Sequence, residues 1–498
     1  MAAVLNESYS NSTDSRHETY DVIIVGAGLA GIGSAYWLQE KCPDKSYLIL
    51  EGRERMGGTW DLFKYPGVRS DSDMFTYGYK FRPWQNPQSL SKGEDILDYI
   101  RETATENGID RNIRFKHKVT GANWSDEENQ WKIESFINGN EKIFYTRFLY
   151  ICTGYYSYEE AYRPTFQGEE NFKGQIILPQ FWPQDLDYTD KNIVVIGSGA
   201  TAVTLIPSMA EKAKSITMLQ RSPSYIMNLP NKNGLFILMK QFLPLKSAYA
   251  ITRRFNLTIS ILIYKFSKAF PRLMKKILMK AAATQAGPDC DVGKHFNPHY
   301  NPWDQRLCIV PDGDLFKAIK SGKASIVTEH IDRFTENGIL LKSGQELEAD
   351  IIVLATGLKI KLLGGATISL NGTPVDTNNS VVYKGMMISD VPNMAIAFGY
   401  TNASWTLKTD LTANYVCDLL NYMDKKGYEV VIPKKEENLE TESFMNFDAG
   451  YIKRANHILP KQGTKKPWRV YQNYFKDMLA IRYGKLDDGV LQFKAKEK

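Results

Sequence analysis

Two glycine-rich turns have the spacing that brings a peptide backbone against a phosphate. The first lies in residues 21–31 (DVIIVGAGLAG) and the second in residues 191–202 (KNIVVIGSGATA), about 170 residues further on. Each follows a β-branched apolar run and precedes a helix-compatible stretch, which is the context of a dinucleotide-binding fingerprint. Glycine lets the backbone approach a pyrophosphate, and a helix N-terminus offers free N–H groups. The pair predicts a protein that holds two dinucleotides and passes electrons between them. The residues assigned to these contacts are Gly26, Gly28 and Gly31 in the first turn and Gly197, Gly199, Ala200 and Thr201 in the second.

The two turns differ in the residue expected to meet the ribose. Glu51 ends an apolar run and lies 20 residues beyond Gly31, where an acidic side chain accepts hydrogen bonds from a ribose 2′-hydroxyl. The corresponding run at 215–220 ends without an acid and is followed by Arg221 and Ser222. A carboxylate repels a 2′-phosphate, whereas arginine binds one through two hydrogen bonds. We therefore expect FAD at the first site and NADPH at the second; the alternative is that Arg221 is a solvated surface arginine.

Length and composition set limits on architecture and location. At 498 residues the chain is too long for a single core, and no apolar run reaches the roughly 18 to 20 residues that span a bilayer. Residues 1–19 are polar and predict a disordered tail, not a secretion signal. The cysteines are scattered, odd in number and without a Cys-x-x-Cys pair, which favours a reducing, cytoplasmic compartment and argues against a dithiol reductase. The five are Cys42, Cys152, Cys290, Cys308 and Cys417.

One segment concentrates the positive charge of the chain. Residues 232–280 contain 11 lysines and arginines and no acid, interleaved with apolar runs such as residues 257–264 (LTISILIY). Such a segment fits two compatible roles: a helical insertion whose apolar faces pack on the second domain, or peripheral contact with an anionic membrane surface. A nucleic-acid partner is not expected.

Two similar phrases indicate how the domains are connected. Residues 148–154 (FLYICTG) and 350–357 (DIIVLATG) each read as a buried parallel strand that ends in Thr-Gly, and the second glycine turn lies between them. The expected fold class is α/β, with two Rossmann-like domains, the FAD domain being interrupted by the NADPH domain. Thr356 and Gly357 are then expected at the cofactor. The expected boundaries are a tail at 1–19, the FAD domain at 20–155 and 341–430, the NADPH domain at 156–340 with a helical insertion at about 232–285, and a C-terminal wrap at 431–498.

Four further motifs resemble those of the class B flavoprotein monooxygenases, and the resemblance runs from about residue 20 to about residue 480. They are GGTWDLFKYPGVRSD at 57–71, FKGQIILPQFWP at 172–183, NPWDQRLC at 301–308 and GYTNASWTLK at 399–408. The second is similar to the fingerprint Phe-x-Gly-x-x-x-His-x-x-x-Trp-Pro of the type I Baeyer–Villiger monooxygenases. The third and fourth look like the subgroup of the bacterial ethionamide-activating monooxygenase.

This resemblance implies a reaction and two catalytic residues. NADPH reduces FAD, reduced flavin and O2 form a C4a-peroxyflavin, and this species converts a small hydrophobic ketone to an ester or lactone, or oxygenates a sulfide. Arg306 matches the family's active-site arginine, whose permanent cation stabilises anionic oxygen. Asp71 matches the aspartate that holds it by a charge-assisted pair. The alternative is that Arg306 and Asp71 form only a structural ion pair between domains.

The same motifs suggest further cofactor contacts. Gly58, Thr59, Trp60 and Tyr65 are expected to line the flavin pocket with Asp71, and core packing is the alternative for Trp60 and Tyr65. Asn402, Trp405 and Lys408 follow a strand tip and are expected to close over the flavin or to contact NADP⁺. His295 and His299 lack a ligand set, so no metal site is expected.

One position departs from the fingerprint. Leu178 stands where the family has histidine, and leucine neither titrates nor donates a hydrogen bond. The departure leaves the reaction class in place but puts its coupling efficiency in question; the alternative is an ordinary core leucine. Three other functions therefore stay open: a heteroatom oxygenase that prefers sulfur or amine nitrogen, an uncoupled NADPH oxidase, and a non-catalytic FAD- and NADPH-binding protein.

Overall fold

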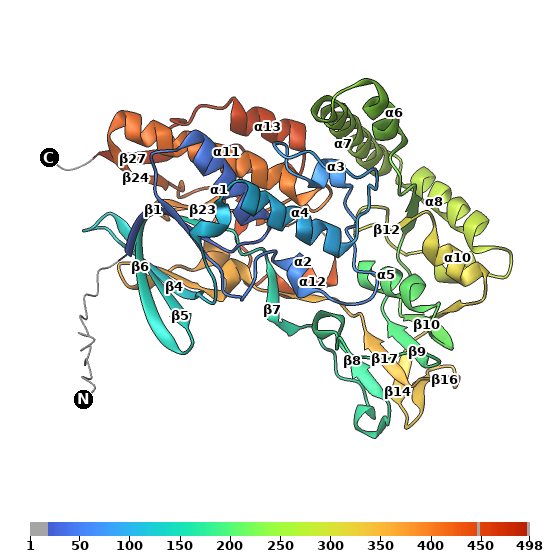
Figure 1. The fold of residues 1–498 in the computed structure, drawn as a ribbon. Coiled ribbons are helices and arrows are strands. Elements are labelled where there is room, and N and C mark those ends of the chain that lie inside the picture. Colours follow the sequence, from blue (N-terminus) through green and yellow to red (C-terminus); the bar gives the residue numbers. More distant parts are fainter. Residues whose placement is uncertain (1–17, 446–448, 496–498) are drawn as a thin grey trace, which may run out of the picture.

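The computed structural model describes residues 18–445 and 449–495, so residues 1–17 of the tail predicted at 1–19 lie outside the described residues. Two sheets organise the chain, and the expected α/β class with two dinucleotide-binding domains is confirmed (Figure 1). Glu18 and Thr19, which were assigned to the tail, belong to the first strand, β1 (Glu18–Val25). None of the helices in the described ranges has the length and apolar character needed to cross a bilayer.

The first domain is built on a nine-stranded sheet whose order is β20-β19-β4-β5-β6-β1-β2-β3, with β23 also paired to β6. Strands β1, β2, β3, β23 and the end of β6 are parallel, whereas β4, β5 and the start of β6 are antiparallel. The remaining strands are β2 (Tyr47–Leu50), β3 (Ile113–Arg114), β4 (Lys118–Ser125), β5 (Gln130–Ile137), β6 (Asn140–Ile151), β19 (Thr367–Leu370), β20 (Thr373–Pro374) and β23 (Met394–Ile396).

The second domain contains a five-stranded parallel sheet in the order β13-β10-β9-β17-β8. Its strands are β8 (Gln175–Ile177), β9 (Asn192–Ile196), β10 (Ser215–Gln220), β13 (Ala324–Thr328) and β17 (Ile351–Leu354). Helices α5 (Ala200–Met209) and α10 (Asp314–Lys320) pack on it. In β9, Ile193 and Val195 face one apolar cluster while Val194 and Ile196 face another, so helices or loops cover both sides of the sheet.

One predicted boundary is wrong. The second Thr-Gly strand, β17, pairs with β9 and β8 of the second sheet and not with the first sheet, so the FAD domain does not resume at residue 341. The chain leaves the first domain through β7 (Tyr156–Ala161) and returns through β18 (Leu358–Ile360), and these two strands pair with each other. The boundary therefore lies near residue 358. A buried apolar strand that ends in Thr-Gly suits either sheet, which is why the sequence alone misplaced it.

The predicted helical insertion is present as three helices, α6 (Gly234–Phe242), α7 (Leu245–Ala269) and α8 (Pro271–Ala286) (Figure 1).

The C-terminal residues wrap the first domain, where α13 (Tyr474–Arg482) packs on α11 (Trp405–Lys426) and Trp468 is buried. The other helices are α1 (Leu29–Lys41), α2 (Thr59–Leu62), α3 (Met74–Tyr77), α4 (Gly93–Glu106), α9 (Val292–His295) and α12 (Gly450–Ala455), and the other strands are β11 (Ile226–Leu229), β12 (Cys308–Pro311), β14 (Ile331–Phe334), β15 (Gly338–Leu341), β16 (Glu346–Glu348), β21 (Val382–Tyr383), β22 (Met387–Ile388), β24 (Tyr428–Pro433), β25 (Thr441–Ser443), β26 (Lys461–Gly463) and β27 (Leu491–Ala495).

Candidate functional site

The first glycine turn joins β1 to α1 and has no room for larger residues. Gly26 adopts a positive φ of 106°, and a Cβ there would lie 2.7 Å from the carbonyl oxygen of Cys152. A Cβ on Gly31 would lie 1.9 Å from the carbonyl oxygen of Gly26. Gly28 caps α1 without a side chain, so the first N–H groups of the helix stay open to a ligand. These features fit a dinucleotide pyrophosphate.

Glu51 lies where the ribose was expected and also holds the turn in shape. Its Oε2 accepts the Ala27 N–H at 2.8 Å, and its Oε1 accepts the Arg53 N–H at 2.9 Å. Burial raises the pKa of Glu51, and these two backbone hydrogen bonds oppose that shift. Each carboxylate oxygen keeps a lone pair that can accept from a hydroxyl. Glu51 can therefore hold the glycine turn and bind a ribose at the same time.

A cavity of about 410 Å³ opens at the carboxyl ends of β1, β2 and β6. It is lined by residues from both glycine turns, because Ala200 and Thr201 at the start of α5 reach it from the second domain. The helix end of the second turn, at Ala200 and Thr201, therefore lies across this cavity from the first turn. The predicted site residues that line it are Gly26, Gly28, Glu51, Gly58, Thr59, Trp60, Tyr65, Asp71, Ala200, Thr201 and Arg306.

Arg306 and Asp71 meet in this cavity. The Nε of Arg306 lies 3.1 Å from Oδ2 of Asp71, and its Nη2 lies 3.2 Å from Oδ1, so the pair is bidentate. Arg306 precedes β12 of the second domain, while Asp71 follows α2 of the first. The carboxylate of Asp71 raises the pKa of Arg306 above its ordinary value, with burial opposing the shift. With 38% of its side chain exposed, Arg306 presents a permanent cation to the cavity.

Trp60 and Tyr65 line the cavity from the first domain. The indole Nε1 of Trp60 donates to the hydroxyl of Tyr77 at 2.9 Å, which fixes the ring. Burial raises the pKa of Tyr65 to about 12, so its hydroxyl stays protonated at physiological pH. Both side chains therefore form a neutral wall of the cavity and also pack into the neighbouring cores, and their contact with a flavin stays a prediction.

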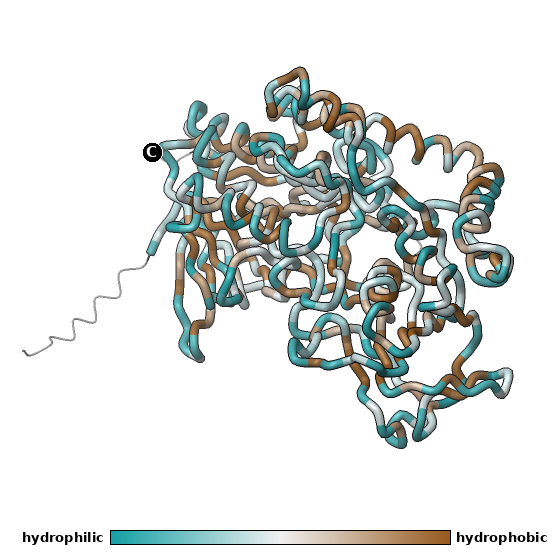
Figure 2. The backbone as a smooth tube through the Cα atoms, turned by 45° about the vertical axis from the view of Figure 1, so that its right-hand side comes forward, coloured by the Kyte–Doolittle hydropathy of each residue, from teal (hydrophilic) through white to brown (hydrophobic). Residues whose placement is uncertain are grey.

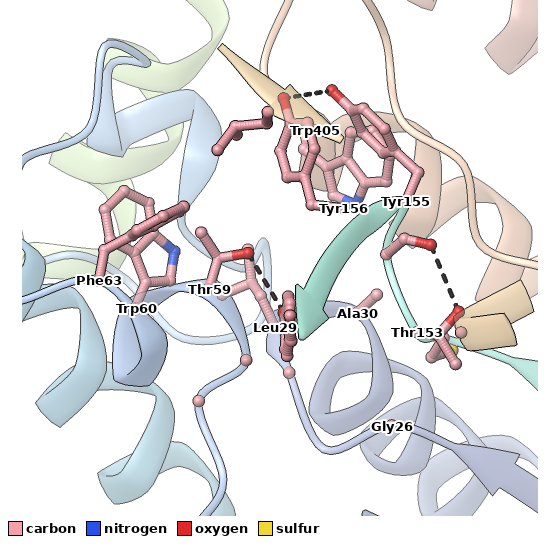
Figure 3. A pocket seen from close by; sticks show the side chains of 18 of the residues that line it. Gly26, Leu29, Ala30, Thr59, Trp60, Phe63, Thr153, Tyr155, Tyr156 and Trp405 are labelled. Atoms are coloured by element: carbon pink, nitrogen blue, oxygen red, sulfur yellow. Dashed lines mark hydrogen bonds between the residues drawn. The ribbon is translucent and has the colours of Figure 1, made fainter. Parts of the chain in front are cut away.

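An aromatic cluster opposite Trp60 combines Trp405, which was expected near the cofactor, with tyrosines that were not predicted. Tyr155 and Tyr156 share a hydrogen bond of 2.9 Å, and the ring of Tyr155 stacks on Trp405 with centroids 5.0 Å apart. Figure 3 shows these three side chains gathered on one side of the cavity, with Trp60 on the other. Tyr451 of the C-terminal wrap packs on Tyr156 at 6.4 Å. Burial raises the pKa of Tyr155, Tyr156 and Tyr451, so the cluster is neutral.

A signal for part of this cluster existed in the sequence. Tyr155 and Tyr156 directly follow the Thr-Gly at the tip of β6, and Trp405 lies inside the quoted motif at 399–408. Tyr451 comes from the C-terminal wrap, and its contact with Tyr156 depends on the packing of that whole segment. No local pattern marks it.

The second cavity, of about 560 Å³, contains the residues expected to meet a 2′-phosphate. Arg221 and Ser222 line it, together with His299, which the sequence analysis considered only as a metal ligand, and with Lys294 and His330, which it did not single out. The side chain of Gln220 at the end of β10 is buried and donates to Oγ1 of Thr328, so no carboxylate faces this space from the strand end. Four basic side chains around an open volume fit a phosphate dianion.

The remaining glycines of the second turn follow the pattern of the first. Gly197 has a φ of 141°, and a Cβ there would lie 2.3 Å from the carbonyl oxygen of Ala355. Gly199 caps α5 without a side chain, and a Cβ there would meet nothing within 4 Å, so the turn faces open space. Neither residue lines the first cavity, and both remain predicted contacts of the second dinucleotide.

Two pairs of predicted cofactor contacts lie elsewhere. Thr356 and Gly357 follow β17 in the second domain, and Oγ1 of Thr356 donates to the carbonyl oxygen of Tyr162, so they are not at the first cavity. Asn402 donates to the carbonyl oxygen of Gln472 at 3.0 Å and lies outside the cavity. Lys408 is also misassigned because it lies one turn into α11, where its side chain is directed into the C-terminal wrap.

Lys408 is held there by buried polar groups. Its Nζ donates to the carbonyl oxygen of Lys384 at 3.0 Å and lies 3.4 Å from Oδ2 of Asp477. Burial lowers the pKa of Lys408, and Asp477 opposes that shift. The side chain thus ties α11 to α13, while the flanking residues Tyr400, Ala403 and Trp405 face the cavity.

Leu178 is a packing residue of the second domain. It adjoins an apolar cluster that includes Phe334, Ile352 and Leu354, and it does not line either cavity. Nearby, a Cβ on Gly174 would lie 2.3 Å from the carbonyl oxygen of Asp350, so the fingerprint glycine is required for the chain to pass β17. The geometry favours the core interpretation of Leu178.

The fold and site together define a two-domain α/β protein with two dinucleotide-type turns that open on a shared, arginine-bearing cavity. A model of the flavin-binding monooxygenase-like family matches residues 21–400. The chain therefore belongs to this family.

Relatives agree with this assignment along nearly the whole chain. The FAD-containing monooxygenase EthA of Mycobacterium tuberculosis is 52% identical over 478 residues, covering 96% of this chain and 98% of its own. The probable FAD-binding monooxygenase AlmA of Acinetobacter baylyi is 48% identical over 480 residues, covering 96% of each chain. Among solved structures, an oxidized steroid monooxygenase bound to NADP has a similar fold, with a TM-score of 0.76 at 21% identity, covering 96% of this chain and all of its own. A cyclohexanone monooxygenase bound to epsilon-caprolactone matches at a TM-score of 0.73 and 18% identity, with the same coverage.

Proposed function

We propose that this chain binds FAD at the first turn and NADPH at the second, and uses O2 to convert small hydrophobic ketones to esters or lactones and to oxygenate sulfides. The observation that carries the proposal is the guanidinium of Arg306, held by Asp71 in the cavity that both turns reach. The names of the relatives EthA and AlmA support the flavin, and the NADP-bound steroid monooxygenase supports the second nucleotide.

Arg306 would act as a fixed cation throughout the cycle. When bound, FAD would take hydride from NADPH and activate O2 for transfer to the substrate. Arg306 stabilises negative charge on the oxygen that is transferred and on the carbonyl oxygen of a ketone under attack. It never needs to lose a proton, since Asp71 raises its pKa further. Asp71 therefore orients the cation and keeps it charged.

The aromatic side chains would form the apolar part of the site, from which water is excluded. Tyr155, Tyr156 and Trp405 present rings to the cavity, which suits an apolar substrate and limits access of water. The hydroxyls of Tyr155 and Tyr156 share one hydrogen bond of 2.9 Å, which fixes the two rings relative to each other. We expect selectivity for chain length or bulk to depend on this cluster.

The proposal is tested with purified, FAD-loaded protein by following NADPH consumption, peroxide and product together, using linear aliphatic ketones and a thioether. Ester formation that matches NADPH use supports it. Sulfoxide without ester indicates a heteroatom oxygenase instead, and NADPH loss that appears only as peroxide indicates an oxidase. Protein that binds both nucleotides and consumes no NADPH with any compound is a binding protein.

Replacing Arg221 by alanine is expected to raise the KM for NADPH roughly 10- to 30-fold and to leave that for NADH unchanged. The reason is that a charge-assisted hydrogen bond to a phosphate contributes about 1.5–2 kcal/mol, and NADH has no 2′-phosphate. Steady-state kinetics with both nucleotides measure the effect. Arg333→Ala removes an exposed arginine from β14 of the same domain and is the matched control. An equal loss with NADPH and NADH would show that Arg221 does not read the phosphate.

Replacing Leu178 by histidine is expected to leave the ratio of product to NADPH unchanged and to lower the melting temperature by a few degrees. Leu178 lies in an apolar cluster outside both cavities, and a polar ring there costs about 1 kcal/mol of stability. Leu178→Met, which keeps the volume apolar, is the control. A rise in coupling for the histidine variant would instead assign position 178 a part in the reaction.

A further inference from the structure

The helical insertion has an outer surface that the fold leaves uncovered. Fifteen large hydrophobic side chains are exposed in the described residues, and eleven of them fall between residues 237 and 277. We call this set, together with the cations between it, the insertion surface; its apolar members are Ile237, Leu238, Phe242, Ile251, Phe255, Ile259, Leu262, Phe266, Phe270, Leu273 and Ile277. Figures 1 and 2 show α6 and α7 at the edge of the molecule, away from the two sheets, with hydrophobic residues recurring along them.

On α7 the exposed apolar residues form a continuous stripe. Residues 251, 255, 259, 262 and 266 follow spacings of four and three, which places them within an arc of about 80° on a helix of 3.6 residues per turn. Phe255 is 52% exposed and Leu262 is 54% exposed. Arg254 and Lys265 flank the stripe, and neither makes an ion pair with the part of the chain that the structure describes.

The opposite face of α7 is fixed on the first domain, so the stripe cannot turn inward. Arg253 donates through Nη1 to the carbonyl oxygens of Phe75 at 2.8 Å and Gly78 at 2.8 Å. Asn256 donates to Oδ2 of Asp73 at 3.0 Å. Thr252 on the same side is fully buried. The stripe therefore faces away from the body of the protein.

From this arrangement we infer that the insertion surface docks on an anionic phospholipid bilayer, with α7 lying in the plane of the interface. The charge selects this partner: residues 232–280 carry 11 lysines and arginines and no acid. Of these cations, Arg253 faces the first domain and Lys268 pairs with Asp304, which leaves others such as Arg254 and Lys265 beside the stripe. Apolar side chains enter the boundary between headgroups and acyl chains while the cations meet anionic headgroups. No helix of the described chain is apolar enough to span the bilayer, so the contact is peripheral.

A second copy of the chain is a poorer partner for this surface. A symmetric pair would bring the same segment against itself, and each side would face the other's cations without a single acid from residues 232–280. Apolar burial would then be opposed by repulsion between like charges. An anionic bilayer satisfies both features of the surface together.

The test is co-sedimentation of the FAD-loaded protein with vesicles of equimolar phosphatidylcholine and phosphatidylglycerol, compared with phosphatidylcholine alone. We expect binding to the anionic vesicles that weakens when salt is raised from about 0.1 M to about 1 M, because the screening length falls to about 3 Å. The triple variant Phe255→Ser/Ile259→Ser/Phe266→Ser is expected to lose at least about tenfold in affinity. Arg254→Gln/Lys265→Gln is expected to lose roughly fivefold for each charge.

The matched control removes exposed apolar residues outside the insertion. Phe136→Ser/Leu479→Ser changes side chains on β5 and α13 that are 43% and 59% exposed, and it is expected to bind like the unaltered protein. Far-UV circular dichroism and the flavin absorbance spectrum verify that every variant is folded.

Three results would overturn the inference. The first is an absence of binding to anionic vesicles at low salt. The second is equal binding to neutral vesicles that salt does not weaken. In the third, the protein forms an oligomer in solution that the triple variant converts to monomer, and vesicles do not compete; the insertion surface then belongs to a second copy of the chain.

Discussion

Replacing Arg306 by alanine is expected to lower the rate of product formation by roughly a hundredfold or more, because it removes the cation that stabilises anionic oxygen in the cavity. Arg306→Lys keeps a positive charge but loses the bidentate geometry that Asp71 imposes at 3.1 and 3.2 Å, so an intermediate rate is expected. Product and NADPH are measured together in single-turnover and steady-state experiments, with protein whose flavin content equals that of the unaltered chain.

Asp71→Ala distinguishes catalysis from a structural tie between domains. Both this variant and Arg306→Ala break the same ion pair, but only Arg306→Ala removes the cation from the cavity. A catalytic arginine predicts a loss of roughly tenfold for Asp71→Ala, which disorders the guanidinium, and a much greater loss for Arg306→Ala. Equal rate losses, accompanied by equal losses in melting temperature, would identify the pair as structural.

The local parts of the architecture were predictable from the sequence because each is encoded within a few residues. The glycine turns, the strand before each and the helix after each follow from apolar runs and glycine spacing. The helices of the insertion follow from their composition and length. In contrast, β17 was assigned to the wrong sheet, since residues 350–357 suit a buried strand in either domain and only the pairing with β9 decides.

The site shows the same division between local and long-range information. Arg306 and Asp71 lie 235 residues apart, and it was the resemblance to a family that predicted their contact. Lys408 was misassigned because its side-chain direction depends on the residue at which α11 begins, Trp405, which fixes the phase of the helix. Tyr451 contacts Tyr156, a residue of the cavity wall, only through the packing of the C-terminal wrap, which no local sequence pattern predicts.

The bilayer inference and the proposed reaction are independent of each other. The part of the insertion surface on α7 lies on the outer side of that helix, whereas Arg253 on its inner side binds carbonyl groups of residues 75–78, shortly after Asp71. A chain that binds vesicles and fails to oxidise ketones would contradict only the reaction. A chain that oxidises ketones and does not bind vesicles would contradict only the docking.

Gly31→Ala is expected to weaken FAD binding by roughly 10- to 100-fold, although alanine is the better helix former by about 1 kcal/mol. The added methyl group should therefore stabilise α1 through helix propensity while its steric clash weakens FAD binding, and the experiment separates these two effects. A Cβ on Gly31 would lie 1.9 Å from the carbonyl oxygen of Gly26, and this oxygen belongs to the backbone of the turn itself. The turn must then move away from the position in which it can approach a pyrophosphate.

Titration of the FAD-free protein with FAD, followed by flavin fluorescence, measures the dissociation constant. The control is Gly234→Ala at the start of α6, where an added Cβ meets nothing within 4 Å and no loss is expected. If Gly31→Ala binds FAD as tightly as the unaltered chain while the melting temperature rises, helix propensity dominates at this position. The close contact between Gly31 of α1 and the carbonyl oxygen of Gly26 would then not be required for FAD binding. If binding falls while the protein remains folded, the steric argument for the turn is upheld.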